Sequence, residues 1–246
     1  MKINMLAEWM TPEALIAALL IFLGSFVQTA IGFGLAIVAA PLLFLISPDY
    51  VPAPICLVAL FISILNALKH RDSVEIGGLK MALIGRVPGS IAGGVLLVMV
   101  STDLLALWLG ALVLFAVIVS LLPFRIEPTP ARMTIAGFFS GFFGTSSGIG
   151  GPPMALLLQH QEANQLRGNL SAFFVFSSMI SLIIQMPAGF LTMHHVWITV
   201  PLIPAAWLGY KLARLTTQTL PKEKIRIGAL LLCSISGATA VWQGLQ

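Results

Sequence analysis

Long apolar runs separated by short polar segments make up most of the chain. Six of these runs contain few or no Asp, Glu or Lys residues: 14–40, 51–68, 81–100, 104–122, 170–191 and 227–242. A helix that crosses the hydrocarbon core of a bilayer needs ~20 predominantly apolar residues. The pattern therefore predicts an all-α polytopic membrane protein in which the apolar runs are transmembrane helices.

The composition supports the same class and excludes others. Of the 246 residues, 58% are hydrophobic and only 9% are charged, whereas a soluble domain has roughly 25% charged residues. Repeated apolar runs argue against a cleaved signal peptide followed by a globular remainder. The formal charge of +4 does not indicate nucleic-acid binding, because the Lys and Arg residues lie between the runs, where they orient helices in the bilayer.

Several motifs recur in the second half of the chain. Segment 32–34 (Gly-Phe-Gly) matches 148–150 (Gly-Ile-Gly), an offset of 116 residues. At the same offset, Pro and Gly at 88 and 93 match 204 and 209, and Phe at 22 and 26 matches 138 and 142. We interpret this as a duplication, with repeats at 1–124 and 131–246 inside one integral membrane domain.

Each repeat begins with a long apolar segment that contains a break. The segments are 14–46 and 133–158, and glycines and prolines interrupt them at 32–35 and 145–153. Each segment is either one kinked span or a hairpin. If both are hairpins, all of the 13 Lys and Arg residues except Lys2 and Arg86 lie in segments on one side of the membrane, as cytoplasmic segments prefer. We therefore predict two inverted repeats, each a broken or hairpin helical segment plus three transmembrane helices, with both termini in the periplasm.

The two breaks are the leading candidates for a binding site. A broken helix exposes backbone N–H groups at a positive half-helix terminus, which favours an anion. The candidate residues at the breaks are Gln28, Thr29, Gly32, Gly34, Thr145, Ser146, Ser147, Gly148 and Gly150. The alternative is that these glycines only allow close helix packing.

Three further polar residues lie inside apolar runs. An intramembrane Arg is a functional candidate, and the fork of Arg86 suits oxyanions. Arg86 also lies six residues after Lys80, so the alternative is that its side chain extends to the interface. Asn66 and Gln185 either line a substrate path or join helices by hydrogen bonds. No Asp or Glu falls within the predicted membrane core, a balance that suits an anionic substrate.

Signs of an enzyme, a cofactor site or a metal site are missing from the sequence. The motifs of serine hydrolases, zinc proteases, P-loop proteins and CxxC redox proteins do not occur. His194 and His195 are adjacent in a predicted loop and diverge, and His70 and His160 are predicted at the interface. Cys56 and Cys233 fall inside predicted spans, where we interpret them as packing residues.

The glycine-rich segments also resemble a known family. The two copies of this segment in the TauE/SafE sulfite exporter family are similar to 24–41 (GSFVQTAIGFGLAIVAAP) and 137–153 (GFFSGFFGTSSGIGGPP). The resemblance implies a bacterial inner-membrane transporter of sulfite, sulfoacetate or related sulfonates, with the two segments framing the substrate path.

We therefore expect a multi-pass secondary transporter of small anions in the cell inner membrane. It would export sulfite or organosulfonates by alternating access between the two broken-helix repeats, with no enzymatic activity and no cofactor. The expected partners are a small anionic substrate and the lipid bilayer, and a homo-oligomer is compatible with the sequence. The alternatives are a non-catalytic membrane subunit and an intramembrane enzyme.

Overall fold

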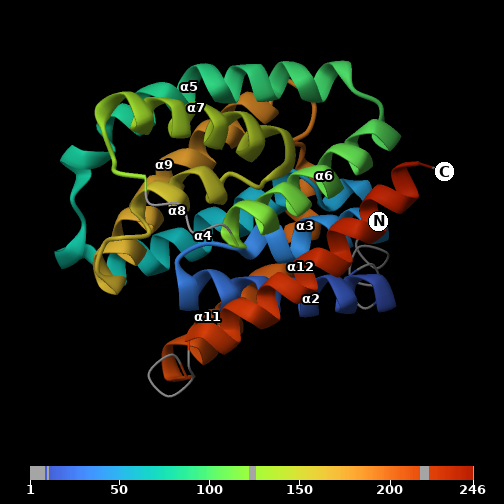
Figure 1. Cartoon of the computed structure of the whole chain (residues 1–246). Coiled ribbons are helices and arrows are strands. Elements are labelled where there is room, and N and C mark those ends of the chain that lie inside the picture. Colours follow the sequence, from blue (N-terminus) through green and yellow to red (C-terminus); the bar gives the residue numbers. More distant parts are fainter. Residues whose placement is uncertain (1–8, 10, 122–125, 217–221, 246) are drawn as a thin grey trace.

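The computed structural model describes residue 9 and residues 11–121, 126–216 and 222–245, which form a bundle of helices without strands (Figure 1). The first half of the chain contains α2 (Pro12–Ile31), α3 (Leu35–Ile46), α4 (Ala53–Lys69), α5 (Ile76–Met99) and α6 (Thr102–Leu121). The second half contains α7 (Pro130–Ser147), α8 (Gly151–Leu158), α9 (Ala163–Gln185), α10 (Met193–Thr199), α11 (Leu202–Thr216) and α12 (Lys222–Gly244). Short 3₁₀ turns precede α4 and α5, namely η2 (Pro48–Tyr50) and η3 (Arg71–Ser73).

The helices have the length and apolar character that a bilayer requires. Four spans qualify within the described residues, namely α2, α4 together with η2, α5 and α9. A fifth qualifies if α10 and α11, which are bent by 44° relative to each other, count as one span. Large apolar side chains such as Val98, Ile183 and Leu231 are more than 60% exposed, as expected of side chains that face lipid. The prediction of an all-α polytopic membrane protein is confirmed.

Glycines in the left-handed region end the helices at both breaks. Gly32 (φ 108°) follows α2 and its N–H donates to Gln28 O at 2.7 Å. Gly148 (φ 79°) follows α7 and its N–H donates to Gly144 O at 3.0 Å. A residue with a Cβ is strained at these φ values, so glycine fixes where each helix stops.

At both breaks the chain doubles back on itself. A methyl group on Gly24 would lie 2.8 Å from the carbonyl oxygen of Leu35, the first residue of α3. A methyl group on Gly150 would lie 2.8 Å from the carbonyl oxygen of Ser140, which precedes the break in α7. The broken segments are therefore hairpins, as the distribution of basic residues predicts, and not single kinked spans.

The same order of helices occurs in each half, and the two halves pack by exchanging partners. The third long helix of each half lies against the first helix of the other, so that α5 packs on α7 and α11 packs on α2. Helices at matching positions also pair, α4 with α9 and α6 with α12. This arrangement agrees with a duplication. The inverted orientation of the halves and the boundaries 1–124 and 131–246 stay predictions.

Small residues bring the backbones of α5 and α7 together. A methyl group on Gly85 would overlap the carbonyl oxygen of Thr134, and one on Gly89 would overlap that of Phe138. Gly209 in α11 has the same relation to Phe22 in α2. Close packing through glycine is a common mode of helix association in membranes. The packing role that the sequence left open for glycine therefore belongs to these residues, whereas the glycines at the breaks turn the chain.

Candidate functional site

The two breaks meet around a small cavity of about 40 Å³ in the interior of the bundle. Residues from the α2–α3 break, α4, α5, the α7–α8 break and α9 line it. The breaks touch each other there, since a methyl group on Gly151 would lie 3.3 Å from Cβ of Phe33. Five of the residues predicted for the site line this cavity: Gln28, Gly34, Arg86, Gly148 and Gly150.

Arg86 extends from α5 into the wall of this cavity and is only 1% exposed. Its Nη1 donates to Ser140 O at 2.7 Å and to Ser140 Oγ at 2.9 Å. Its Nη2 donates to Ser177 O at 3.1 Å and to Ser181 Oγ at 2.9 Å. The side chain therefore does not extend to the interface, and the alternative role considered for Arg86 does not apply.

No acidic side chain in the described part of the chain forms an ion pair with Arg86. Among the described residues the ion pairs are Arg71 with Asp72 and His194 with Asp49, both at exposed side chains. All the groups that accept hydrogen bonds from Arg86 are neutral, and its buried Nε atom has no partner. A buried charge without a counter-charge is costly, and a bound anion in the cavity would lower that cost.

Glycines at the second break make room for the guanidinium group. A methyl group on Gly144 would lie 2.8 Å from Arg86 Nη2, and one on Gly150 would lie 3.1 Å from Nη1. The α7–α8 hairpin thus turns the chain and also leaves the space that Arg86 fills.

Two half-helices begin at the cavity. α3 starts after Gly34 and α8 starts after Gly150, and neither helix has a side-chain cap at its N-terminus. Both glycines line the cavity. The N-terminus of a helix carries partial positive charge. Together with Arg86, these helix ends give the cavity an electrostatic character that favours an anion.

The hydroxyl groups of the second break do not line the cavity. Ser146 Oγ donates to Phe142 O at 2.7 Å and accepts from Trp108 Nε1 at 3.1 Å. Ser147 Oγ donates to Phe143 O at 2.6 Å. At the end of a helix, Ser side chains readily bond to the carbonyl oxygen four residues earlier. These contacts hold the hydroxyl groups of Ser146 and Ser147 against α7 and α6.

Thr145 and Gln185 lie behind the cavity wall. Thr145 Oγ1 is 2.9 Å from Ser181 Oγ, which itself accepts from Arg86. Gln185 Nε2 donates to Thr145 O at 2.8 Å. These residues join α7 to α9 and support the serine that holds Arg86.

The remaining predicted residues are Thr29 and Gly32, at the end of α2, and Asn66 of α4. Asn66 Nδ2 donates to Thr29 Oγ1 at 3.2 Å, and both residues line a second, larger cavity. Gln28 Nε2 donates to Ser63 Oγ at 3.2 Å. Gly32 ends α2 beside Leu170 and Arg167 and does not line the central cavity.

The sequence pattern did not single out the serines that hold Arg86. Ser140, Ser177 and Ser181 are all buried and come from α7 and α9. Ser140 and Ser181 accept through their hydroxyl groups, whereas Ser177 accepts through its backbone carbonyl oxygen, which no side-chain pattern along the sequence signals.

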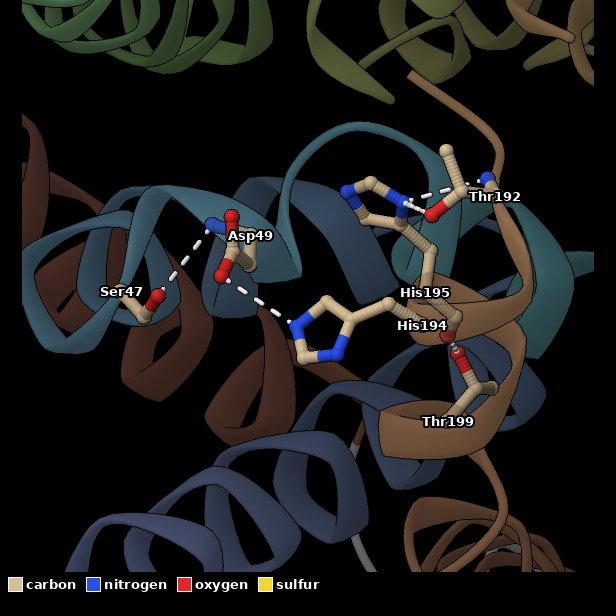
Figure 2. A network of polar contacts seen from close by, with 6 residues as sticks. All are labelled: Ser47, Asp49, Thr192, His194, His195 and Thr199. Atoms are coloured by element: carbon tan, nitrogen blue, oxygen red, sulfur yellow. Dashed lines mark hydrogen bonds and ion pairs between the residues drawn. The ribbon is translucent and has the colours of Figure 1, made fainter. Parts of the chain in front are cut away.

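A polar cluster surrounds His194 and His195 (Figure 2), and none of its labelled residues lines the central cavity. His194 Nε2 is 3.4 Å from Asp49 Oδ2. The Thr192 N–H donates to His195 Nδ1 at 3.2 Å, and this bond belongs to a capping box that starts α10. The prediction of a loop at these histidines is therefore wrong. Among the described residues no group of His, Cys, Asp or Glu has the arrangement of a metal site.

Comparison with known proteins gives one match. A model of the family described as "Sulfite exporter TauE/SafE" matches residues 17–240, nearly the whole chain. No curated protein and no solved structure matches the chain.

Proposed function

Because the chain belongs to the sulfite exporter TauE/SafE family, a family of transporters, we propose that it carries small oxyanions such as sulfite through the cavity beside Arg86. That it is a multi-pass membrane transporter and not an enzyme follows from the family and from the apolar helices. The substrate, the binding residues and the mechanism are the proposal.

One observation carries the proposal, namely the buried guanidinium group of Arg86 at the meeting point of both breaks. It is 1% exposed and bonds only to neutral oxygen atoms of Ser140, Ser177 and Ser181. The uncapped starts of α3 and α8 add positive character to the same cavity. A small anion in the cavity would offset the charge of Arg86 and the partial positive charges at the starts of α3 and α8.

The volume of the cavity favours a compact substrate over a large one. A cavity needs roughly 10–15 Å³ of such space to hold one water molecule, so about 40 Å³ leaves room for a compact group. An inorganic oxyanion needs little widening of this space, whereas an organosulfonate needs the breaks to separate further. We therefore place sulfite ahead of organosulfonates as the substrate.

The arrangement of the two hairpins supports alternating access as the mechanism. Each hairpin packs on a helix of the other half, since α7 contacts α5 and α2 contacts α11. Movement of one half against the other would change the access of the cavity from one side of the membrane to the other. We further propose that the protein lies in the inner membrane with both termini in the periplasm. The direction of transport is export.

Counterflow of labelled sulfite into proteoliposomes tests the proposal. The Arg86→Gln variant loses a charged partner of the anion, which typically costs about 2 kcal/mol or more of binding, roughly a 30-fold change. We expect saturable exchange in the wild type and little exchange in this variant. Arg71→Gln is the matched control, because Arg71 is an exposed residue of η3 with a side chain 78% exposed.

Two results would contradict the proposal. One is the absence of saturable exchange for sulfite and other oxyanions in wild-type protein that elutes as a folded species, which returns the membrane-subunit alternative. The other is unchanged exchange in Arg86→Gln. The milder Ser181→Ala variant keeps the charge and removes one hydrogen bond, so it serves if Arg86→Gln does not fold.

A further inference from the structure

A second cavity, of about 560 Å³, lies where α4 ends, α9 begins and α11 ends. We call it the basic vestibule. Its lining includes Thr29, Asn66, Lys69, His70, Arg167 and Arg214. Three of these are permanent cations from three helices that are far apart in sequence. The proposed function makes no use of this cavity.

The positive charge of the basic vestibule is not neutralised within it. Asp72 is the acidic residue in its lining, and this carboxylate lies 3.6 Å from Arg71, outside the lining. Arg167 donates from Nη2 to Ala30 O at 2.6 Å, which positions its side chain but leaves its charge unpaired. Burial, together with the charges of Arg167, Lys69 and Arg214, lowers the pKa of His70.

Buried polar side chains lead from the basic vestibule towards the central cavity. Asn66 is 3% exposed and Thr29 is 6% exposed, and they are joined by a hydrogen bond. The neighbouring pair, Gln28 and Ser63, is joined in the same way, and Gln28 lines the central cavity. In both pairs α2 supplies one side chain and α4 the other. The two pairs follow one another along α2 and α4, between two regions of positive charge.

We propose that the basic vestibule is a second oxyanion-binding site, where the transported anion binds before it passes Asn66 and Gln28 to reach Arg86. This inference rests on the proposed function for the identity of the anion. A lipid phosphate shares the same chemistry, but the buried amide at the base of the vestibule favours a free anion that can move deeper. The cations raise the local concentration of the anion, and this effect weakens as salt screens their charges.

Transport kinetics test the role of the vestibule. In Arg214→Gln we expect the KM for sulfite counterflow to rise about fivefold at low salt, with little change in maximal rate, because one charge near the anion is lost. The KM should also depend less on salt than in the wild type. Lys211→Gln is the matched control: Lys211 lies on the same helix, is exposed, stacks on Trp207 and does not line the vestibule. An unchanged KM in Arg214→Gln, or an equal rise in Lys211→Gln, would overturn the inference.

Direct binding separates this inference from the proposed function. Equilibrium dialysis of labelled sulfite against the full chain in detergent should show a salt-sensitive site that Arg86→Gln retains and that Arg86→Gln combined with Arg214→Gln loses. If wild-type protein binds sulfite at this site but shows no counterflow, the transport proposal is rejected and the vestibule site stands. Absence of this site in Arg86→Gln would reject the vestibule. So would its displacement by stoichiometric phosphatidylglycerol but not by phosphatidylcholine, because the vestibule would then be a lipid site.

Discussion

Arg86 and the glycines around it show how single residues shape the site. The guanidinium group occupies space that Gly144 and Gly150 leave open, and it bonds to Ser140 on the same hairpin. Its hydrogen-bond acceptors are neutral, so a bound anion, as proposed above, would offset its charge. The sequence identified Arg86 as a candidate but left two roles open for it. Burial in the folded bundle excludes an extension to the interface, and a role in substrate binding stays a prediction.

At this scale we predict that Gly148→Ala destabilises the protein and slows sulfite exchange. A residue with a Cβ in the left-handed region costs roughly 1–2 kcal/mol. At Gly148 (φ 79°) the methyl group would also lie 3.0 Å from Ile55 Cγ2, at a position that lines the cavity. Gly189→Ala is the control, because Gly189 (φ 82°) has the same strain and no atom within 4 Å.

Thermal unfolding in detergent and sulfite counterflow measure the two effects. Both variants should unfold at lower temperature, and only Gly148→Ala should lose exchange. Equal transport in the two variants would show that the break tolerates a side chain.

The helices are positioned mainly by contacts that need small residues. α5 carries Gly85 and Gly89 one turn apart, and both face the backbone of α7. This contact also fixes the distance from Arg86, on the same helix, to Ser140 on α7. The packing of two helices therefore sets the geometry of the charged site.

For this interface we predict that Gly89→Ala lowers stability by more than Gly78→Ala does. The methyl group at 89 would overlap the carbonyl oxygen of Phe138, so the helices must separate. Overpacking of this kind typically costs about 1–3 kcal/mol. At Gly78, near the start of the same helix, a methyl group has no atom within 4 Å, and Ala is a better helix former than Gly.

Melting temperatures of the purified variants measure the difference. An equal or higher melting temperature for Gly89→Ala than for Gly78→Ala would mean that α5 and α7 do not need this close contact.

At the scale of the whole molecule, α2 begins and α12 ends on the same side of the bundle (Figure 1). This is the arrangement that a hairpin followed by three spans, used twice, produces. The basic vestibule brings Lys69, Arg167 and Arg214 together, and the distribution of basic residues predicts these three on one side of the membrane. That this side is the cytoplasm stays a prediction.

Thiol labelling tests the topology. Ile3→Cys and Gln246→Cys should react with an impermeant maleimide added to intact cells, because both termini are predicted to be periplasmic. Asp72→Cys, at a side chain 91% exposed in η3, should react only after the membrane is opened. Cys56 and Cys233 are buried and should give little background. If Asp72→Cys is labelled in intact cells and the two terminal cysteines are not, the predicted topology is wrong and the opposite orientation holds.

The sequence by itself determined the class of protein, the two breaks and their residues. Apolar runs of membrane-spanning length exclude a soluble fold, and glycine at 32, 34 and 148 is required by backbone φ values that other residues avoid. Local chemistry decides these features, so a single chain is sufficient to predict them. Of the twelve residues that it predicted for one site, five line one cavity, namely Gln28, Gly34, Arg86, Gly148 and Gly150. That they bind the substrate stays a prediction.

Only the tertiary structure decided which polar groups reach the cavity. The hydroxyl groups of Ser146 and Ser147 bond to α7 and α6, whereas the Ser181 hydroxyl group and the Ser177 carbonyl oxygen, far away in sequence, accept from Arg86. It also decided that Lys69, Arg167 and Arg214 share one cavity. These outcomes depend on how helices from the two halves pack. Spacing along one chain records the faces of each helix but not the partner that each face meets.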